Sequence, residues 1–545
     1  MKIAVLSNVN LDMVNLPLAK KYDVFQADGY GQWVSYALTK NEQLSQFAPK
    51  LIFVLLDGSA LLETCVSYEQ GVEELRNNIN YFRTMSSNYS QSTIVVSTID
   101  IFPKRVSAQV DIGIGEKWSA FWREELGKLV AEKKNILPFD LQSLIVAEGR
   151  KNIYDDKMWY MGSIPYGVKS ITLFTQAIDD FVTKFSYTRK KVLVVDLDNT
   201  LWGGVVGEEG PLGITLGESK LGAAYRDAQK RIKEIKDTGI LLAIVSKNNE
   251  AEVQEAFRTN PHMVLHEDDF VAIKNNWQQK FENIKELANE LNLGLDAIVF
   301  WDDNEVEREA VKINLPMVAV PDFPRNVALL PQAVENLYDT YFWLPRQTAE
   351  DAAKTQQYQQ EAARKEALQA AGTIDDYLKS LQIKIDLCEV QDNQIERTVQ
   401  LLNKTNQFNT NTVRMDMQEF LQYKATAGHH VYVANVSDRY GDSGLVVELL
   451  THEEGTDFVI DNFLMSCRVM SRQIEDAVIY GVLQQAEKFG CKMAKCSYVK
   501  TAKNKPVENL WEHLGFELKQ QTEDIKNYEV QLPYSKQPLL EVSVK

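Results

Sequence analysis

The stretch Val192-Leu193-Val194-Val195-Asp196-Leu197-Asp198-Asn199-Thr200 joins four apolar residues directly to two carboxylates spaced two positions apart. A continuous apolar run of this kind predicts a strand that is buried on both faces, as in a parallel sheet covered by helices. Ligands of an open α/β sheet bind beyond the carboxyl ends of its strands. Asp196 and Asp198 are therefore predicted to stand at a ligand site.

Two further apolar runs end in the same way. Ile240–Val245 leads into Ser246-Lys247-Asn248, and Ala297–Trp301 leads into Asp302-Asp303-Asn304. Because the carboxyl ends of parallel strands meet at one edge of the sheet, these polar residues are predicted to lie near Asp196.

The two carboxylates suit phosphoryl transfer. One can attack phosphorus and form an aspartyl phosphate, and the other can protonate the leaving oxygen and later activate water. Because nucleophile and phosphate are both anionic, the pair predicts a Mg²⁺ ion held by oxygen ligands. The predicted ligands are Asp196, Asp198, Asp302 and Asp303, and the choice between Asp302 and Asp303 stays open. A helix cap or a surface turn is the alternative interpretation of Asp196 and Asp198.

The phosphate itself needs hydrogen-bond donors and a cation. Ser246 can donate to a phosphoryl oxygen, with a helix N-cap as the alternative, and Lys280 can neutralise phosphate and nucleophile. A solvated helix face is the alternative for Lys280, and Lys274 is its rival. The predicted phosphate-binding set is Thr200, Ser246, Lys247, Asn248 and Lys280. The order Asp, Ser, Lys, Asp-Asp resembles the four-part pattern of the haloacid-dehalogenase (HAD) superfamily, which implies a Rossmann-like core.

The glycine-rich stretch Leu201–Gly210 predicts a β-hairpin flap over this site. No large cap domain fits between Asp198 and Ser246. A small flap would leave the site open to a bulky or carrier-borne substrate.

A closer resemblance rests on longer motifs. The relevant stretches are DLDNTLWGGVVGEEG (196–210), SKNNE (246–250), NWQQKFENI (276–284), WDDNEVERE (301–309), LLNKTNQFN (401–409), DRYGDSGLV (438–446), IDNFLMSCRVMSR (460–472) and KNKPVENLWEHLGF (503–516). Together they resemble the FkbH-like family. The resemblance implies a phosphatase-like domain that takes a glyceryl unit from 1,3-bisphosphoglycerate, removes phosphate and passes the glyceryl group to an acyl carrier protein.

The same resemblance implies an α/β multidomain chain. An SGNH-hydrolase-like domain is expected over 1–185, the HAD-like domain over 186–345, a helical connector over 346–381 and a GNAT-like acyltransferase domain over 382–545. The connector, rich in Ala, Gln, Glu and Lys, is interpreted as a solvated spacer that ends at Gly372.

The N-terminal domain departs from the hydrolase pattern. The expected nucleophile position falls near Ser7 or Asn8, yet the first histidine of the chain is His262. Asp155-Asp156-Lys157-Met158 stands where Asp-x-x-His is expected. Because a serine hydrolase needs a histidine base, this domain is predicted not to be a hydrolase.

The C-terminal domain departs from its pattern too. The stretch Arg468–Gln473 lacks the glycine that lets a GNAT backbone approach a pyrophosphate, so CoA binding is in doubt. Arg468 and Arg472 are predicted to hold the single phosphate of a carrier protein's phosphopantetheine arm. Asn504 and Trp511 stand at the thioester-arm and catalytic-tyrosine positions. Further acyl-site candidates, with caps and turns as the alternative, are Lys404, Asn406, Gln407 and Asn409.

Cys467 is a candidate catalytic residue. It follows a predicted strand and adjoins Arg468 at a predicted helix start, and both features lower a thiol pKa. A thiolate there could hold the glyceryl group as a thioester. A buried structural cysteine is the alternative.

Charge and cysteine content narrow the setting. The net charge of -17 argues against nucleic acid or an anionic membrane as the main partner. Five cysteines without a CxxC pair fit free thiols in a reducing compartment. No apolar stretch has the length of a membrane span. A cytoplasmic location is expected.

These observations predict a Mg²⁺-dependent phosphatase and glyceryl transferase whose partners are a small phosphorylated metabolite and an acyl carrier protein. One alternative is a stand-alone phosphatase of a small soluble metabolite. The other is a non-catalytic scaffold that binds a carrier protein.

Overall fold

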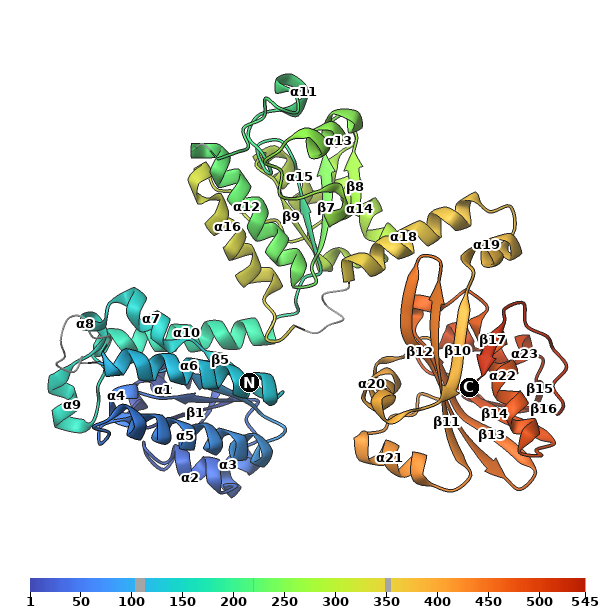
Figure 1. The fold of residues 1–545 in the computed structure, drawn as a ribbon, viewed down its shortest axis with the longest axis horizontal. Helices are drawn as coiled ribbons and strands as arrows, with labels where there is room; N and C mark the ends of the chain where they lie inside the picture. The colour runs from blue at the N-terminus through green and yellow to red at the C-terminus, as the bar shows by residue number, and fades with distance from the viewer. Residues whose placement is uncertain (103–112, 219, 348–353, 545) are drawn as a thin grey trace. The chain divides into compact units, whose positions relative to one another are not determined.

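The computed structural model describes residues 1–102, 113–218, 220–347 and 354–544. The chain divides into two compact units. The first combines Met1–Lys190 with Pro331–Gln347, and the second combines Lys191–Leu330 with Thr348–Lys545. Figure 1 shows three α/β sheets along the chain, one in the first unit and two in the second. The predicted α/β multidomain fold class is confirmed.

The first unit is built on a five-stranded parallel sheet of order β2-β1-β3-β4-β5. Its strands are β1 (Lys2–Ser7), β2 (Asp23–Phe25), β3 (Leu51–Leu55), β4 (Thr93–Ser97) and β5 (Ile136–Phe139). Its helices are α1 (Asp12–Leu18), α2 (Trp33–Leu38), α3 (Glu42–Phe47), α4 (Gly58–Leu61), α5 (Tyr68–Asn88), α6 (Ile114–Glu132), α7 (Leu141–Glu148), α8 (Arg150–Ile153), α9 (Asp156–Gly162) and α10 (Val168–Ser186).

Helices bury both faces of this sheet, which explains why its strands are apolar throughout. Ile52 and Val54 of β3 join one core with Trp118 and Trp122 of α6. The alternate residue Phe53 joins the opposite core, where α10 packs.

Residues 331–347 belong to the first unit. The predicted bounds assign 331–345 to the HAD-like domain and 346–347 to the connector, and these bounds stay a prediction. Residues 331–347 contain all but the first residue of α16 (Leu330–Leu337) and the π-helix η4 (Tyr338–Phe342). Trp343 packs edge-on against Phe181 of α10, and Arg346 donates to the carbonyl of Val130 on α6 (2.7 Å). Contacts with α10 and α6 therefore draw this segment back to the N-terminal sheet.

The second unit begins with a parallel sheet of order β8-β7-β6-β9. Its strands are β6 (Val192–Val195), β7 (Leu241–Ser246), β8 (Phe270–Asn275) and β9 (Ile298–Trp301). The main helices are α11 (Val206–Glu209), α12 (Lys220–Asp237), α13 (Glu250–Thr259), α14 (Lys280–Glu290) and α15 (Glu305–Asn314). The register pairs Val195 with both Ile244 and Trp301. Asp196 and Asp302 therefore follow their strands at the same level.

The expected β-hairpin flap is wrong. The stretch after Thr200 has isolated bridges, from Trp202 to Asp198 and from Gly203 to Thr215, and the short helix α11. Asn199 adopts a left-handed conformation (φ 58°), and its Oδ1 accepts from the Gly204 N–H (3.0 Å). This local turn diverts the chain before strand pairing can extend.

The C-terminal part carries an eight-stranded mixed sheet of order β15-β16-β14-β13-β12-β11-β10-β17. Its strands are β10 (Lys384–Glu389), β11 (His429–Asp438), β12 (Gly441–Glu454), β13 (Asp457–Met465), β14 (Met493–Val499), β15 (Glu517–Gln521), β16 (Ile525–Gln531) and β17 (Val542–Val544). The pairs β13–β14 and β10–β17 are parallel, and the others are antiparallel. The helices are α20 (Ile395–Lys404), α21 (Met417–Ala425), α22 (Ile474–Lys488) and α23 (Leu510–His513).

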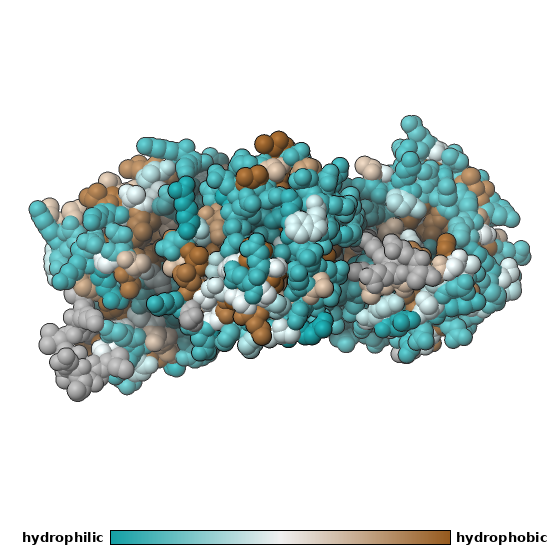
Figure 2. Space-filling model, turned by 90° about the horizontal axis from the view of Figure 1, so that it is seen from above, coloured by the Kyte–Doolittle hydropathy of each residue, from teal (hydrophilic) through white to brown (hydrophobic). Residues whose placement is uncertain are grey.

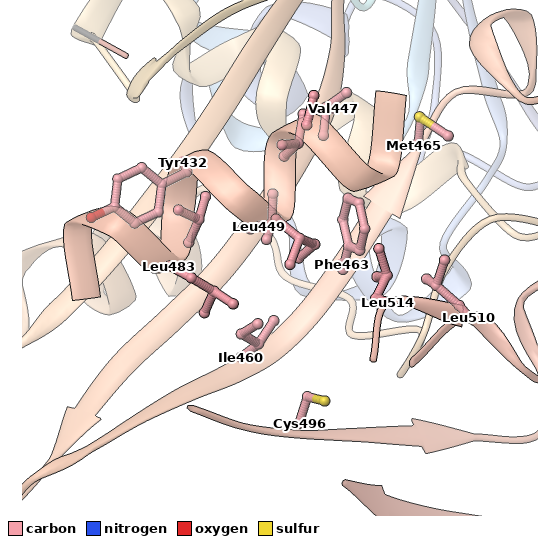
Figure 3. Packing of buried hydrophobic residues seen from close by; sticks show 14 of the residues in the cluster. Tyr432, Val447, Leu449, Ile460, Phe463, Met465, Leu483, Cys496, Leu510 and Leu514 are labelled. Carbon is pink, nitrogen blue, oxygen red and sulfur yellow. The ribbon is translucent and has the colours of Figure 1, made fainter. Parts of the chain in front are cut away.

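Each face of the central strands has its own core. Figure 3 shows Tyr432 and Leu449 of the sheet near Leu483 of α22, all within the larger core. Val433 and Leu464 face the opposite core, which α20 and α21 cover. Strand residues therefore alternate between two buried faces.

The connector is not the solvated spacer that its composition predicts. It forms α18 (Lys354–Ala370) and α19 (Ile374–Leu381). Arg364 of α18 is buried and makes a two-pronged ion pair with Asp438 (2.7 and 2.9 Å). The partner lies 74 positions further on, so local composition could not reveal it.

On the face seen in Figure 2, hydrophobic residues form separate patches within a mainly hydrophilic surface. Among the helices in the described ranges, none is both long and apolar enough to span a membrane.

Candidate active site at the carboxyl edge of β6

Asp196, Lys280 and Asp302 form a buried charge cluster at the carboxyl edge of the four-stranded sheet. The Asp196 N–H donates to the carbonyl of Trp301 (3.1 Å), which extends the β6–β9 register into the site. Lys280 Nζ lies 2.7 Å from Asp196 Oδ1 and 2.6 Å from Asp302 Oδ2. All three side chains are almost fully buried, so water screens these contacts little.

Lys280 is the lysine that the fold brings to the site. It is the first residue of α14, and burial acts against its charge, but the Asp196 and Asp302 carboxylates outweigh burial and raise its pKa. The rival Lys274 lies on β8 and pairs with Glu290. Lys280 therefore remains charged beside the predicted nucleophile.

Three carboxylates lie close enough together to share one cation. Oxygen atoms of Asp196, Asp302 and Asp303 lie within 4.8 Å of one another. Burial and the charge of Asp196 raise the pKa of Asp302 to about 7, despite the neighbouring Lys280. Both Asp302 and Asp303 belong to the cluster, so both residues of the open choice are in reach of one ion.

Asp198 lies outside that three-carboxylate cluster. Its Oδ1 accepts from the indole Nε1 of Trp202 (2.9 Å) and from the Val206 N–H (3.1 Å). Burial raises the pKa of this carboxyl, although hydrogen bonds from Val206, Trp202 and Asn248 oppose the rise. Its role as acid and base fits this position, and its role as a metal ligand stays a prediction.

The predicted phosphate binders occupy the edge of β7 and the loop after β6. Asn248 donates to Ser246 Oγ (3.0 Å), and both side chains are buried. Lys247 pairs with Glu307 of α15 (2.7 Å). Thr200 is fully buried, and its Oγ1 accepts from the Asp303 N–H (3.2 Å), so Thr200 fastens the β6 loop to the β9 loop.

Sequence reasoning missed two residues, Trp202 and Arg308. Trp202 holds Asp198, and Arg308 Nη1 donates to the carbonyls of Asp302 (2.8 Å) and Asp303 (2.7 Å). Both lie inside the motifs 196–210 and 301–309. A sequence motif does not predict which carbonyl or carboxylate group a side chain will contact. Arg308 fixes the turn that presents the two acidic groups.

In the described part of the first unit, the residues at the expected hydrolase positions make hydrogen bonds within the chain. The Ser7 Oγ accepts from the Val9 N–H (3.2 Å), and Asp155 caps α9 by accepting from the Met158 N–H (3.1 Å). At the corresponding sheet edge, Asp57 is buried, accepts from the Tyr166 hydroxyl (3.0 Å), and has its pKa raised by burial to about 6. The side chains of Ser7, Asp155 and Asp57 therefore have hydrogen-bond partners within the chain. The sequence of this unit contains no histidine.

The predicted phosphopantetheine site is engaged with α18. Arg472 is buried and contacts Asp438 (3.1 Å) and Glu361 of α18 (3.0 Å). Arg468 donates to Gln357 of the same helix (3.4 Å). The Cys467 side chain lies outside the described residues. The phosphate-binding role of both arginines stays a prediction. To bind a phosphate, Arg468 and Arg472 would have to give up their present contacts within the chain.

A segment of the chain itself fills the gap between β13 and β14. The two strands pair only at their starts, over Asp457–Ile460 and Met493–Cys496. Beyond that point, Thr410 bridges them: its N–H donates to the Phe463 carbonyl (3.0 Å), and its carbonyl accepts from the Val499 N–H (2.9 Å).

Asn504 hydrogen-bonds to this segment, and both polar atoms of its side chain have partners within the chain. Its Nδ2 donates to the carbonyls of Asn409 (3.0 Å) and Val499 (2.8 Å), while its Oδ1 accepts from the Tyr498 hydroxyl and the Thr501 N–H. Trp511 is fully buried, and its Nε1 donates to the Ser497 carbonyl (3.2 Å). Neither is available to a thioester arm here.

The other acyl-site candidates divide between turns and surface. Asn409 is buried within a turn, where its Oδ1 accepts from the Thr412 N–H (2.7 Å). Lys404 and Gln407 are exposed. Asn406 accepts from Arg414 (2.7 Å). The turn interpretation therefore accounts for Asn409.

A hollow of about 360 Å³ lies on the C-terminal sheet, beside β13, β14 and β16. Its two lysines are already paired, Lys495 with Asp457 and Lys519 with Glu529. Cys496 also lines the hollow, and burial raises its pKa well above the usual value. None of the carboxylates near Asp196 lines the hollow.

Solved structures that resemble this chain include N-acetyltransferases and a protein with a phosphatase domain. No protein-family model matches the sequence, and no curated protein matches it. Parts of the chain are similar to the *Escherichia coli* ribosomal-protein-S18-alanine N-acetyltransferase (10% identity, 28% of this chain, 96% of that chain, TM-score 0.23) and to *Vibrio cholerae* spermidine N-acetyltransferase (10%, 28%, 97%, 0.23).

A likeness over a longer stretch is to the N-terminal part of the Bacteroides fragilis protein BF1531, which contains a phosphatase domain and is complexed with Mg. Identity is 25%, coverage is 64% of this chain and 94% of that chain, and the TM-score is 0.52. That share is about 350 of the 545 residues, more than twice the length of Lys191–Leu330. The chain therefore shares its fold with a protein that contains a phosphatase domain, over more than the four-stranded sheet alone.

Proposed function

We propose that the site around Asp196 is a magnesium-dependent phosphatase centre, and that the chain is a phosphatase and glyceryl transferase of the FkbH-like type. The observation that carries the proposal is the position of Asp196, which pairs with Lys280 at 2.7 Å inside a cluster of three carboxylates. The phosphatase domain and the Mg of the *B. fragilis* structure support it.

The donor set fits Mg²⁺. Asp196, Asp302 and Asp303 offer hard oxygen ligands within 4.8 Å of one another, and Lys280 is the one buried cation that contacts Asp196 and Asp302 among the described residues. Negative charge therefore exceeds positive charge in the cluster. A bound Mg²⁺ would supply the charge that lets an anionic carboxylate approach an anionic phosphate.

The residues then divide the chemistry between them. An Asp196 oxygen attacks phosphorus, and the bond from phosphorus to the leaving oxygen breaks as Asp198 gives that oxygen a proton. Asp198 next takes a proton from water, which attacks phosphorus and releases Asp196. Lys280 and Ser246 stabilise charge on the phosphoryl oxygens.

The substrate that we propose is a phosphoglyceryl donor such as 1,3-bisphosphoglycerate, with an acyl carrier protein as acceptor. The motifs shared with the FkbH-like family support this substrate and partner. The stretch after Thr200 carries the four-residue helix α11, and a site without a cap domain would stay open to a carrier-borne substrate. In this scheme the Cys467 thiolate attacks the acyl carbon of the donor and displaces the acyl phosphate as inorganic phosphate, while Asp196 acts on the remaining phosphate ester. The thiol of the carrier's arm then attacks this thioester, takes the glyceryl unit and releases Cys467. Arg468 and Arg472 receive the phosphate of the carrier's arm.

A stand-alone phosphatase of a small metabolite is the second candidate. It is favoured by Arg472 and Asn504, whose polar groups are occupied within the chain. A non-catalytic scaffold is disfavoured, since it would not need a buried lysine between two carboxylates.

Intact-mass spectrometry of a cognate phosphopantetheinylated carrier separates these candidates. The carrier is incubated with the protein, Mg²⁺ and 1,3-bisphosphoglycerate, and a glyceryl mass shift is expected with wild type but not with Asp196→Asn. Phosphate release without any mass shift would favour the stand-alone phosphatase. Neither phosphate release nor a mass shift would favour the scaffold.

A further inference from the structure

We infer that α18 is an autoinhibitory helix whose Glu361 carboxylate competes with a phosphate for Arg472; this inference rests on the proposed role of Arg468 and Arg472 in binding the phosphate of a carrier's arm. Arg472 Nη2 lies 3.0 Å from Glu361 Oε2, and Arg468 Nη1 donates to Gln357 Oε1 (3.4 Å). Gln357 and Glu361 are four positions apart, so they lie on the same face of the helix. One face of α18 therefore contacts both arginines.

The two acidic partners of Arg472 differ in how firmly the fold holds them. The Asp438 side chain is 1% exposed, and it accepts two hydrogen bonds from Arg364 (2.7 and 2.9 Å) and one from the Tyr440 N–H (2.9 Å). The Glu361 side chain is 44% exposed, and its contact with Arg364 is longer, at 3.4 Å. Asp438 is therefore a permanent partner of Arg472, whereas Glu361 is the partner that a ligand can replace.

The charges of this cluster favour an anion in place of Glu361. The positive charges of Arg364 and Arg472 are balanced by Asp438 and Glu361, and both arginines are buried. Burial and the charge of Arg364 lower the pKa of Arg472, so an additional anion nearby stabilises its charged form. A guanidinium group binds phosphate with the same geometry as carboxylate. A phosphate can therefore take the place of the Glu361 carboxylate.

The backbone around Arg472 does not depend on α18. Ser471 (φ 63°) and Gln473 (φ 53°) both adopt left-handed conformations, which residues other than glycine rarely adopt. Strain of this kind is concentrated at ligand sites and switches, where the surrounding structure maintains it. Arg472 Nη2 also donates to the Arg468 carbonyl (2.6 Å). Arg472 therefore remains in position when Glu361 leaves.

Calorimetric titration of the full-length protein with 4′-phosphopantetheine tests this competition. Glu361→Gln removes the competing charge and should lower the Kd about two- to fivefold, as expected for a partly exposed ion pair. Asp375→Asn is the matched control, because Asp375 is exposed on α19 and its replacement changes the net charge equally. Pantetheine, which lacks the phosphate, should show no difference between these variants. In wild type, amide hydrogen exchange of α18 should become faster when 4′-phosphopantetheine binds.

The possible outcomes separate the inhibitory helix from the phosphate site itself. Tighter binding by Glu361→Gln but not by Asp375→Asn, with faster exchange in α18 on binding, supports the inference. Equal Kd values for wild type and both variants, with binding weakened in Arg468→Met, overturn the inference and leave the proposed phosphate site intact. Undiminished binding by Arg468→Met, or no binding by either wild type or Glu361→Gln, overturns the proposed phosphate site and this inference with it.

Discussion

At the residue scale, the site depends on one lysine between two carboxylates. Lys280 contacts Asp196 and Asp302, and all three side chains are buried. Removing one partner of a buried ion pair leaves an uncompensated charge, and this costs about 3–5 kcal/mol. Either the Lys280 ammonium group or a divalent cation can therefore neutralise the negative charge of these carboxylates.

We predict that Lys280→Met lowers the melting temperature of the Mg²⁺-free protein and that Mg²⁺ restores more stability to the variant than to wild type. The reason is that the cation replaces the lost positive charge beside Asp196 and Asp302. Differential scanning fluorimetry with and without Mg²⁺ measures both effects. Lys274→Met is the control, because its partner Glu290 is half exposed and the pair contributes roughly 1 kcal/mol at most. Identical melting of Lys280→Met and wild type in both conditions would contradict the account.

The pair Lys247–Glu307 gives a second prediction at this scale. Lys247 directly follows Ser246, and in this structure Glu307 engages its ammonium group at 2.7 Å. Glu307→Gln should lower KM for a phosphorylated substrate by about two- to fivefold with little change in kcat, because Lys247 becomes free to meet the substrate's charge. Lys247→Met should raise KM instead. Steady-state kinetics of the two variants check the signs, and a shift of both KM values in the same direction would be inconsistent with this role.

Much of this site could be predicted from the sequence, but the residues that position its carboxylates could not. Polar residues directly after apolar runs pointed to Asp196, Ser246 and Asp302, because strand ends meet at one edge. Lys280 followed from the order of the motifs. The roles of Trp202 and Arg308 could not be predicted, because a side-chain hydrogen bond depends on the rotamer and on the local turn. Neither produces a periodic pattern in the sequence.

At the element scale, a strand could be predicted from the sequence where it is buried on both faces, because its residues then form a continuous apolar run. β6, β7 and β9 are buried throughout and were recognised as continuous apolar runs. β8 is only partly buried, β14 alternates apolar residues with Lys495 and Ser497, and β15 is wholly exposed, so none of the three forms a continuous apolar run. The flap was predicted as a hairpin from its glycines, whereas the Asn199 turn and the hydrogen bonds to Asp198 impose another path.

Glu448 on β12 gives a prediction about stability and pH. Its side chain is fully buried, and within the described part of the chain neither carboxylate oxygen has a hydrogen-bond partner. Burial raises its pKa well above the usual value, so the folded domain holds this carboxyl neutral while the unfolded chain ionises it. The stability that goes with the raised pKa is complete below the unfolded pKa and is lost as pH rises toward the folded pKa.

Glu448→Gln should therefore be more stable than wild type at pH 8 and nearly equal to it at pH 4.5. Hydrogen exchange of peptides from β11, β12 and β13, followed by mass spectrometry at the two pH values, localises the effect to this sheet. Glu454, exposed at the end of β12, supplies the control Glu454→Gln, which should be neutral at both pH values. Loss of protection in Glu448→Gln at pH 8 would show that the ionised carboxylate has a stabilising partner.

At the scale of the whole molecule, the sequence patterns predicted the fold class, and the domain bounds stay a prediction. Residues 331–347 follow the second sheet in sequence yet pack with the first unit, through Trp343 and Arg346. In the same way, α18 reads as a spacer but contributes Arg364 and Glu361 to ion pairs with the C-terminal part. Long-range partners of this kind are set by tertiary packing, which local composition does not encode.

The central claim concerns a covalent bond between phosphorus and Asp196. Its most direct measurement is peptide mass spectrometry of protein quenched during turnover with Mg²⁺ and a phosphorylated substrate, then reduced with borohydride, which converts an aspartyl phosphate to homoserine. The account predicts homoserine at position 196 in wild type, at none of the other acidic positions of the site, and no such conversion in Asp196→Asn. Sustained phosphate release with Asp196 unmodified, or undiminished release by Asp196→Asn, would contradict it.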